Sequence, residues 1–303
     1  MNADLTVIIL THDEEVNLPH AFRSLAPLEA RIVVVDSWSA DGTAEIARGM
    51  GCEVVEHAFS TQAEQLNWAL DHVQIDTPWI MRIDADERLT TDLAEELLQV
   101  VGLAPEDVTG FEVKRRVYFW GRWIRHGGHY PTWLLRVWRR GTARSELRWM
   151  DEHMVSSKGT IEKLKNDIID ENHKGLAFWV SKHNRYADRE VKELLRGGGG
   201  RAIKIVGQAG RKRWLKQNVY LRAPLFVRAL AYWFYRYFLR LGFMDGIAGF
   251  VFHFNQGLWY RLLVDAKLYE ARLAATNSVG RVVEESAGAG GEIGKGQSTT
   301  IRG

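Results

Sequence analysis

Short apolar strands alternate with helical segments in the N-terminal part of the chain, and this alternation constrains the fold most. Apolar or β-branched runs typical of strands occupy residues 5–10, 31–35, 52–55 and 79–83. Apolar residues at helical spacing follow the first strand, and helices are also expected up to residue 50 and over residues 62–72. Strands joined by crossover helices form a parallel sheet that is buried on both faces. The sequence therefore predicts an α/β fold, a mostly parallel sheet flanked by helices.

Acidic residues follow three of these strands. Glu14 comes after the first, Asp36 ends the second, and Asp84 and Asp86 follow the fourth. Ligands of such sheets bind beyond the carboxyl ends of the strands, so we expect these residues to meet at one edge. An extended chain points Asp84 and Asp86 the same way, so together they can hold a hard divalent cation.

A solvated acidic turn is the other interpretation of an isolated Asp-x-Asp. Three acidic clusters at one edge repel each other, however, unless a cation or hydrogen-bond donors offset them. A nucleotide sugar supplies both, because its imide N–H and ribose hydroxyls donate and its diphosphate meets the metal. The pattern therefore predicts a nucleotide-diphosphate donor.

Four motifs in a fixed order, at residues 7–15, 34–43, 65–70 and 84–87, resemble those of the family 2 inverting glycosyltransferases of the GT-A fold. The resemblance covers about the first 140 residues, with the order and spacing of the motifs intact. Within that family, residues 182–187 and 235–246 are most similar to the bacterial enzymes that add a hexose to the lipopolysaccharide core. The resemblance implies a GT-A (Rossmann-like) sheet and metal-dependent, inverting transfer of a hexose.

The resemblance also implies a donor site. In it, Thr11 and Glu14 border the nucleoside, Asp36 recognises the base and Asp84 lies near the ribose. Asn67, from the third motif, is placed with these donor-binding residues. Asp86 is the residue that coordinates the metal, Mg²⁺ or Mn²⁺, and the diphosphate. The family's usual donor is a UDP-sugar, so the resemblance implies UDP as the nucleotide, and we prefer glucose to galactose as the sugar.

Inverting transfer needs a base that faces the acceptor hydroxyl, opposite the leaving diphosphate. The segment Asp151-Glu152-His153 follows a basic, aromatic stretch, much as the base-bearing segment of the family follows its acceptor-side strands. We favour Glu152 as the catalytic base, because it aligns better with the His-Glu pair common in the subfamily, and place Asp151 second. A surface acidic pair beside an incidental histidine is the alternative, and His153 is otherwise a contact to the acceptor or a phosphate.

Arginine and aromatic residues are interleaved over residues 111–149. Aromatic faces stack on sugar rings and guanidinium groups bind phosphates, so this stretch favours a phosphorylated or lipid-linked saccharide acceptor. Single-stranded nucleic acid is bound by the same residue types, and composition alone does not exclude it. We expect a saccharide and no nucleic acid. His126 and His129 are read as part of a flexible polar loop in preference to a metal pair.

The C-terminal third is basic and aromatic. No acidic residue lies between Glu193 and Asp245, although the whole chain has a net charge of only +2. Such helices lie in membrane interfaces, and no uncharged run reaches the ~20 residues of a spanning helix. We therefore expect residues 196–283 to be a helical, membrane-associating appendage on an anionic surface. A hairpin packed on the catalytic domain, or across the interface of a homo-oligomer, is the alternative.

Residues 1–195 are expected to form the catalytic domain, with residues 1–110 binding the nucleotide sugar and residues 111–175 on the acceptor side. Residues 284–303 are expected to be a disordered tail. A single cysteine, Cys52, and an N-terminus without a targeting segment predict a cytoplasmic protein, peripheral on the inner membrane face.

The predicted function is transfer of one hexose to a lipid-linked or lipopolysaccharide core saccharide. Processive synthases of the family carry Gln-x-x-Arg-Trp, whereas Gln208 and Arg211 are followed here by Lys212. A protein or peptide glycosyltransferase and a catalytically idle sugar-nucleotide-binding module are the alternatives.

Overall fold

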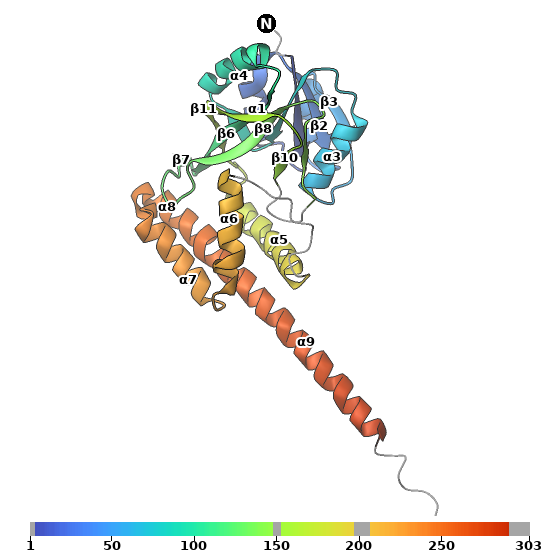
Figure 1. Ribbon diagram of the computed structural model, residues 1–303, viewed down its shortest axis with the longest axis vertical. Coiled ribbons are helices and arrows are strands. Elements are labelled where there is room, and N and C mark those ends of the chain that lie inside the picture. The colour runs from blue at the N-terminus through green and yellow to red at the C-terminus, as the bar shows by residue number, and fades with distance from the viewer. Residues whose placement is uncertain (1–3, 148–152, 197–206, 291–303) are drawn as a thin grey trace, which may run out of the picture.

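The computed structural model describes residues 4–147, 153–196 and 207–290, with side chains up to residue 276. Strands and helices of the N-terminal part form the upper body of the molecule, and the C-terminal helices lie below it (Figure 1). Within the described residues, one nine-stranded sheet has the order β3-β2-β1-β4-β8-β6-β11-β5, with β7 beside β6. Its strands are β1 (Leu5–Thr11), β2 (Arg31–Asp36), β3 (Glu53–Glu56), β4 (Trp79–Asp84), β5 (Glu87–Leu89), β6 (Val108–Phe119), β7 (Arg122–Trp123), β8 (Thr132–Arg139) and β11 (Thr160–Asp170). Strands β9 (Ala143–Ser145) and β10 (Met154–Ser156) form a separate antiparallel pair.

The helices begin with α1 (Leu18–Leu25), α2 (Thr43–Gly49), α3 (Gln62–His72) and α4 (Thr91–Leu103), which belong to the N-terminal body. The remaining helices are α5 (Gly175–Leu195), α6 (Gly207–Asn218), α7 (Val227–Phe234), α8 (Gly246–His253) and α9 (Tyr260–Gly290). Short 3₁₀ or π segments are η1 (Ala26–Leu28), η2 (Tyr220–Arg222), η3 (Tyr235–Leu239), η4 (Gly242–Asp245) and η5 (Phe254–Trp259).

The first half of the sheet is parallel, as the alternation of strands and helices predicted. Strands β3, β2, β1 and β4 all pair in parallel. The other half is mixed: β8 is antiparallel to both β4 and β6, while β6 and β11 are parallel. The antiparallel pairings arise because β6 reverses into β7 through the tight turn at Trp120 and Gly121, both with positive φ.

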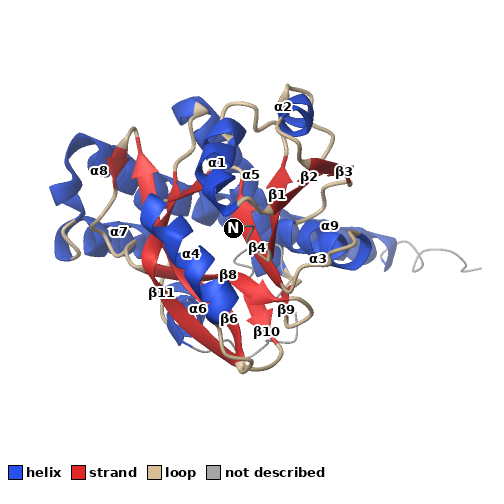
Figure 2. Cartoon of the chain, turned by 90° about the horizontal axis from the view of Figure 1, so that it is seen from above, coloured by secondary structure: helices blue, strands red, loops and turns tan. Residues whose placement is uncertain are grey.

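Alternation along β1 fills the cores on both faces of the sheet. Leu5, Val7 and Ile9 pack in one buried cluster with residues of α1 and α4, whereas Ile8 and Leu10 pack in another with residues of α3. Figure 2 shows the sheet between these helices. The sheet is therefore covered on both faces and is a rigid support for the loops at its edge, as expected for a GT-A-like α/β fold.

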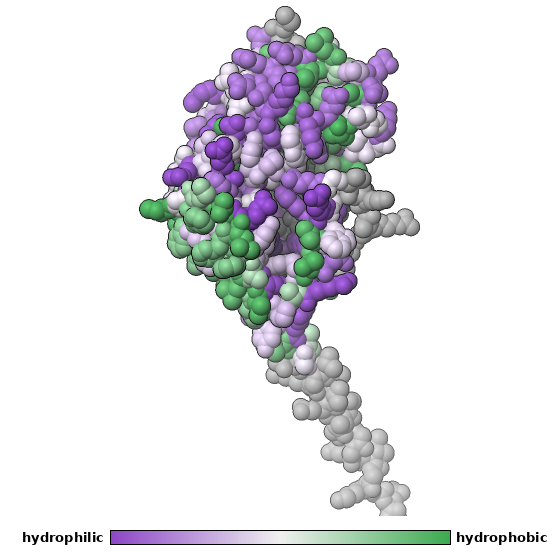
Figure 3. Space-filling view, turned by 60° about the vertical axis from the view of Figure 1, so that its left-hand side comes forward, coloured by the Kyte–Doolittle hydropathy of each residue, from purple (hydrophilic) through white to green (hydrophobic). Residues whose placement is uncertain are grey.

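The C-terminal helices have cores of their own. Ala187 and Val191 of α5 pack against Tyr260, Val264 and Leu268 of α9. A buried ion pair fixes α7 to α9, with Arg228 Nε 2.8 Å from Asp265 Oδ1. Figure 3 shows that hydrophobic residues gather on the surface of this region. No helix in the described part of the chain is long and apolar enough to cross a membrane.

One sequence-based expectation fails at the C-terminus. Helix α9 continues to Gly290, so residues 284–290 are helical and do not belong to the predicted tail. Extending an existing helix by one residue costs far less than starting a new one, and Glu and Ala are good helix formers. The remainder of the predicted tail, and the glycine run at residues 197–200, lie outside the described residues.

Candidate functional site

The predicted strand-end residues meet at one edge of the sheet. Thr11, at the end of β1, pairs in register with Asp36 at the end of β2, and Leu10 pairs with Asp84 at the end of β4. The loops after β1, β2 and β4 therefore leave the sheet side by side. This placement follows from the parallel order β2-β1-β4, which brings all three carboxyl ends to the same edge.

Asp36 is held by three hydrogen bonds. Its Oδ1 accepts from Thr11 Oγ1 at 2.7 Å and from Ser39 Oγ at 2.6 Å, and its Oδ2 accepts from the Ser39 backbone N–H at 2.8 Å. Each carboxylate oxygen has about two acceptor sites, so Oδ2 has room for one further donor. Asp36 is thus an oriented anion that can accept an N–H from a ligand.

Two arginines hold Asp84. Arg82 Nη2 donates to its Oδ1 at 3.0 Å, and Arg136 Nη2 of β8 donates to its Oδ2 at 3.1 Å. Burial by itself would raise the pKa of Asp84, but the two guanidinium groups outweigh this effect and lower the pKa. Asp84 therefore stays ionised and its direction is fixed.

Glu87 contacts both Arg136 and Asp84 and so supports this arrangement. It forms an ion pair with Arg136, and its Oε2 accepts the Asp84 backbone N–H at 3.0 Å. Burial raises the pKa of Glu87 to about 7. Glu87 is buried, so it acts on Arg136 and Asp84 and not on a ligand directly.

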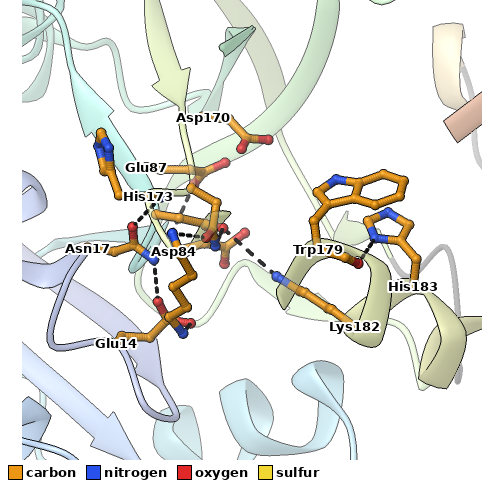
Figure 4. Close-up of polar contacts among 12 residues, drawn as sticks. Glu14, Asn17, Asp84, Glu87, Asp170, His173, Trp179, Lys182 and His183 are labelled. Atoms are coloured by element: carbon orange, nitrogen blue, oxygen red, sulfur yellow. Dashed lines mark hydrogen bonds and ion pairs between the residues drawn. The ribbon is translucent and has the colours of Figure 1, made fainter. Parts of the chain in front are cut away.

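Asp86 is held by groups from a different part of the chain. Its Oδ2 accepts from Asn172 Nδ2 at 3.0 Å, and Lys182 Nζ of α5 lies 3.9 Å from the same oxygen. Figure 4 shows Lys182 directed from α5 toward the carboxylates. The extended chain expected through Asp84 and Asp86 does not form, because β4 ends at Asp84 and the next two residues form a turn. That the two carboxylates act together on one cation stays a prediction.

Glu14 is the third acidic group of the edge. Lys174 Nζ lies 2.8 Å from its Oε1, and Asn17 Nδ2 donates to its Oε2 at 2.7 Å (Figure 4). Burial raises the pKa of Glu14, and the hydrogen bonds from Lys174 and Asn17 lower it by less. The site thus pairs carboxylates with cations and amides, which offsets the repulsion expected between the acidic clusters.

Sequence reasoning missed the residues that β11 and α5 contribute. Asn172 and Lys174 follow β11, and Lys182 lies within α5. Burial would lower the pKa of Lys182, but Asp86 and other nearby carboxylates outweigh burial and raise it, so this ammonium stays charged. Asp170 ends β11, and burial raises its pKa to about 6. The sequence signal that could have revealed these residues is the polar run at residues 170–174, which begins at the last residue of β11.

Two other predicted groups lie elsewhere. The amide of Asn67 is occupied by the backbone of Ser145 in β9, with Nδ2 donating to its carbonyl at 2.9 Å and Oδ1 accepting from its N–H at 3.0 Å. Asn67 thereby ties α3 to β9 instead of joining the carboxylates at the sheet edge. Asp151 and Glu152 lie outside the described residues, so their placement stays a prediction. Neighbouring His153 contacts Glu146, with its backbone N–H 3.1 Å from Oε1.

Several arginines of the basic, aromatic stretch have structural partners. Arg116 pairs with Asp167, Arg144 pairs with Asp71, and Arg139 donates to the Val108 carbonyl. Arg136 supports Asp84, as described above. Arg116, Arg136 and Arg139 are therefore engaged in contacts within the sheet, whereas the Arg144–Asp71 pair lies exposed at the surface.

A divalent cation fits this site through one protein ligand. Mg²⁺ is commonly held by one or two carboxylates together with substrate phosphates. Asp86 Oδ1 accepts no hydrogen bond from the described residues, whereas both oxygens of Asp84 accept from arginines. No group of three or more His, Cys, Asp or Glu side chains among the described residues could hold a metal alone. The site therefore suits a cation that arrives with a diphosphate.

Comparison with known proteins relates the chain to glycosyltransferases. A family model described as "Glycosyl transferase family 2" matches residues 6–149. The lipopolysaccharide core biosynthesis glycosyltransferase LpsC of Rhizobium meliloti (strain 1021) is 27% identical over 284 residues, covering 88% of this chain and 92% of that protein. An uncharacterized glycosyltransferase of Rickettsia felis is 23% identical and covers 91% of this chain and 93% of that protein.

Among solved structures, S. aureus TarS 1–349 in complex with UDP-GlcNAc is similar at 13% identity, with 89% of this chain and 92% of that chain covered and a TM-score of 0.45. At that TM-score the likeness is too distant to support a conclusion about this chain.

Proposed function

Because residues 6–149 form a family 2 glycosyltransferase domain, we propose that the protein moves one hexose from a nucleotide sugar to a saccharide acceptor, with inversion at the transferred sugar. The observation that carries the proposal is the row Asp36, Asp84 and Asp86 along one edge of a parallel sheet. Their surroundings differ in a way that suits the three parts of a nucleotide sugar.

In this proposal the nucleoside lies over the ends of β1 and β2. Asp36 Oδ2 accepts the imide N–H of the base, and Thr11 keeps Asp36 oriented for this contact. Glu14 borders the nucleoside, and Asp84 accepts from a ribose hydroxyl. A uracil base fits this pattern, and UDP-glucose is the donor we propose.

The diphosphate lies next to Asp86 and α5. Asp86 would hold a divalent cation, Mg²⁺ or Mn²⁺, and the cation would supply positive charge next to the leaving diphosphate. Lys182, 3.9 Å from Asp86, supplies a second positive charge from the protein. Lys182 thus binds a phosphate oxygen, while Asn172 keeps Asp86 in position. As the bond from the sugar to the diphosphate breaks, these groups stabilise the negative charge that develops.

Glu152 is the base that takes the proton from the acceptor hydroxyl, with Asp151 as the second candidate. The acceptor is a lipid-linked or lipopolysaccharide core saccharide at the cytoplasmic face of the inner membrane. LpsC is a lipopolysaccharide core biosynthesis glycosyltransferase that is similar over most of both chains, and this similarity supports the proposed class of acceptor.

The test is transfer by the full-length protein from UDP-glucose with Mn²⁺ to a panel of delipidated core oligosaccharides, with peptides as the competing acceptor class. NMR of the product reads the anomeric configuration. A β-linked saccharide from the α-linked donor supports the proposal, whereas a glycosylated peptide or a retained configuration contradicts it.

A further inference from the structure

Exposed apolar side chains are concentrated in one segment of the C-terminal region. Half of the large apolar side chains that are exposed among the described residues lie between residues 226 and 254. We call them the apolar face: Phe226, Val227, Leu230, Phe234, Tyr235, Phe238, Leu239, Leu241, Phe243, Met244, Ile247, Phe250 and Phe254. Figure 3 shows the hydrophobic surface of this region beside a mostly hydrophilic catalytic body.

Three of the four charged residues of the same segment, Arg228, Arg236 and Asp245, are turned inward, and Arg240 is exposed. Arg228 pairs with Asp265, Arg236 Nε donates to the Gly127 carbonyl at 3.0 Å, and Asp245 Oδ1 lies 2.7 Å from His126 Nδ1. All three of these charged residues are buried. Proteins that face only water normally show the opposite arrangement, with charges outside. This segment is therefore built to place apolar groups at its surface.

The apolar face is continuous across several elements. Ring contacts join Phe234 to Phe238 at 5.0 Å and Phe250 to Phe254 at 6.1 Å between centroids. Tyr237 bridges the two groups, 5.2 Å from Phe238 and 5.9 Å from Phe250. Helices α7 and α8 thus present one surface, and contiguous apolar surfaces of this kind mark interaction sites.

Positive charges border the apolar face. Arg222 and Arg240 are exposed, and Arg122 lies beside Gly246 at the start of α8. The sequence contains no acidic residue from 194 to 244. A second copy of this chain, docked by twofold symmetry, would bring this basic border against itself. Anionic lipid headgroups complement it, and aromatic and aliphatic groups suit the boundary between headgroups and acyl chains.

We propose that the apolar face inserts into the headgroup region of an anionic bilayer, with Arg222, Arg240 and Arg122 contacting lipid phosphates. The inference deepens the proposed function, on which it rests, by naming the surface that brings the enzyme to a lipid-borne acceptor. The protein lies on the bilayer through this face, since no described helix could span it.

Cosedimentation of the full-length protein with vesicles of phosphatidylcholine containing phosphatidylglycerol tests this inference. Ile247 and Leu239 are 79% and 65% exposed, so Ile247→Glu and Leu239→Glu change the surface without opening the core. Each is expected to lower the vesicle partition coefficient by about tenfold or more, because apolar burial is lost and a like charge meets the lipid. Leu103→Glu is the matched control, since Leu103 is 83% exposed on α4 of the catalytic body and should leave binding unchanged.

A separate variant tests the arginines that border the apolar face. Arg240→Gln is expected to weaken binding to anionic vesicles and to leave the weaker binding to pure phosphatidylcholine unchanged. UDP binding, measured by calorimetry on the same variants, reports on the donor site and on folding. Retained UDP binding with lost vesicle binding supports the inference, and failure of the proposed function would instead appear as absent UDP binding.

Three results would overturn the inference. If the wild-type protein stays in the supernatant, it has no membrane-binding surface. Equal sedimentation of wild type and both glutamate variants places the contact elsewhere. A dimer of the wild type that Ile247→Glu converts to a monomer in light scattering, without vesicle binding, makes a second copy the occupant of the apolar face.

Discussion

Asp84 and Asp86 are separated by one residue, yet their surroundings give them different chemistry. Asp84 is fixed between Arg82 and Arg136, and neither of its oxygens is free of a guanidinium contact. Among the described residues, Asp86 contacts an amide and a distant ammonium, and its Oδ1 accepts no hydrogen bond from them. In our proposal the metal contact therefore belongs to Asp86 and an oriented hydrogen bond to Asp84. The Asp-x-Asp motif alone does not distinguish these roles, because they depend on β8, β11 and α5.

Replacing Lys182 with Gln should raise the KM for the donor by about tenfold, since one charge-assisted contact to a phosphate contributes roughly 1.5–3 kcal/mol. Lys182→Arg keeps the charge and should recover part of the loss. Initial rates at varied UDP-glucose measure the effect, with Lys267→Gln on α9 as the control. A donor KM that is unchanged in Lys182→Gln would remove this residue from the diphosphate site.

Replacing Glu152 with Gln should leave the Kd for UDP unchanged and lower transfer by about 10²–10⁴-fold, the usual contribution of a general base. Asp151→Asn is the matched comparison and should retain most of the activity. Normal transfer by Glu152→Gln together with loss in Asp151→Asn would reassign the base to Asp151.

At the scale of elements, local sequence patterns predicted the helices and strands that depend on such patterns. The helix expected at residues 62–72 is α3, and the four strands expected before residue 84 are β1 to β4. Their order along the chain also placed Thr11, Asp36 and Asp84 at one edge. The contribution of α5 was not accessible in this way, because Lys182 reaches Asp86 only through the packing of α5 on α9. The same holds for Asn67, whose partner Ser145 is distant in sequence.

Contacts between loops and segments distant in sequence were likewise not predicted from the sequence. His126 was expected in a flexible polar loop, but it bonds to Asp245 at the start of α8. Gly127 in that loop has φ +70°, and a Cβ there would lie 2.1 Å from His253 Cε1. Such close approach is a property of two elements together, and neither segment reveals it alone.

Helix α6 is fastened to the β9–β10 pair through Glu146, which pairs with Arg213. Burial alone would raise the pKa of Glu146, but hydrogen bonds from His153 and Arg213 outweigh it and lower the pKa to about 2. A depressed carboxyl pKa stabilises the fold above its unfolded value of 4.5, and this contribution is lost as the pH falls toward 2. The shift corresponds to about 3 kcal/mol.

Glu146→Gln should therefore lower the free energy of unfolding at pH 7 by roughly 1–3 kcal/mol, and the difference from wild type should shrink between pH 4.5 and 2. Urea denaturation across this range measures it, with exposed Glu162→Gln as the control. A difference that stays constant with pH would show that the ion pair of Glu146 does not stabilise the docking of α6.

At the scale of the whole molecule, the helices that follow the sheet contribute Lys182 to the candidate site and present a surface of their own. Helix α5 supplies Lys182, α9 holds α5 in place, and α7 and α8 carry the apolar face. In our proposals α5 serves the donor diphosphate, and α7 and α8 serve the membrane that holds the acceptor. All of these helices follow residues 6–149, which the family model matches.

The most direct test of the central claim is donor hydrolysis by the full-length protein across a panel of nucleotide sugars, with and without Mn²⁺, for wild type and Asp86→Ala. We expect metal-dependent use of one UDP-hexose by wild type and a loss of at least about 10²-fold in Asp86→Ala, with UDP still bound through Asp36. Hydrolysis that Asp86→Ala leaves intact, or the absence of binding to any nucleotide sugar, would contradict it.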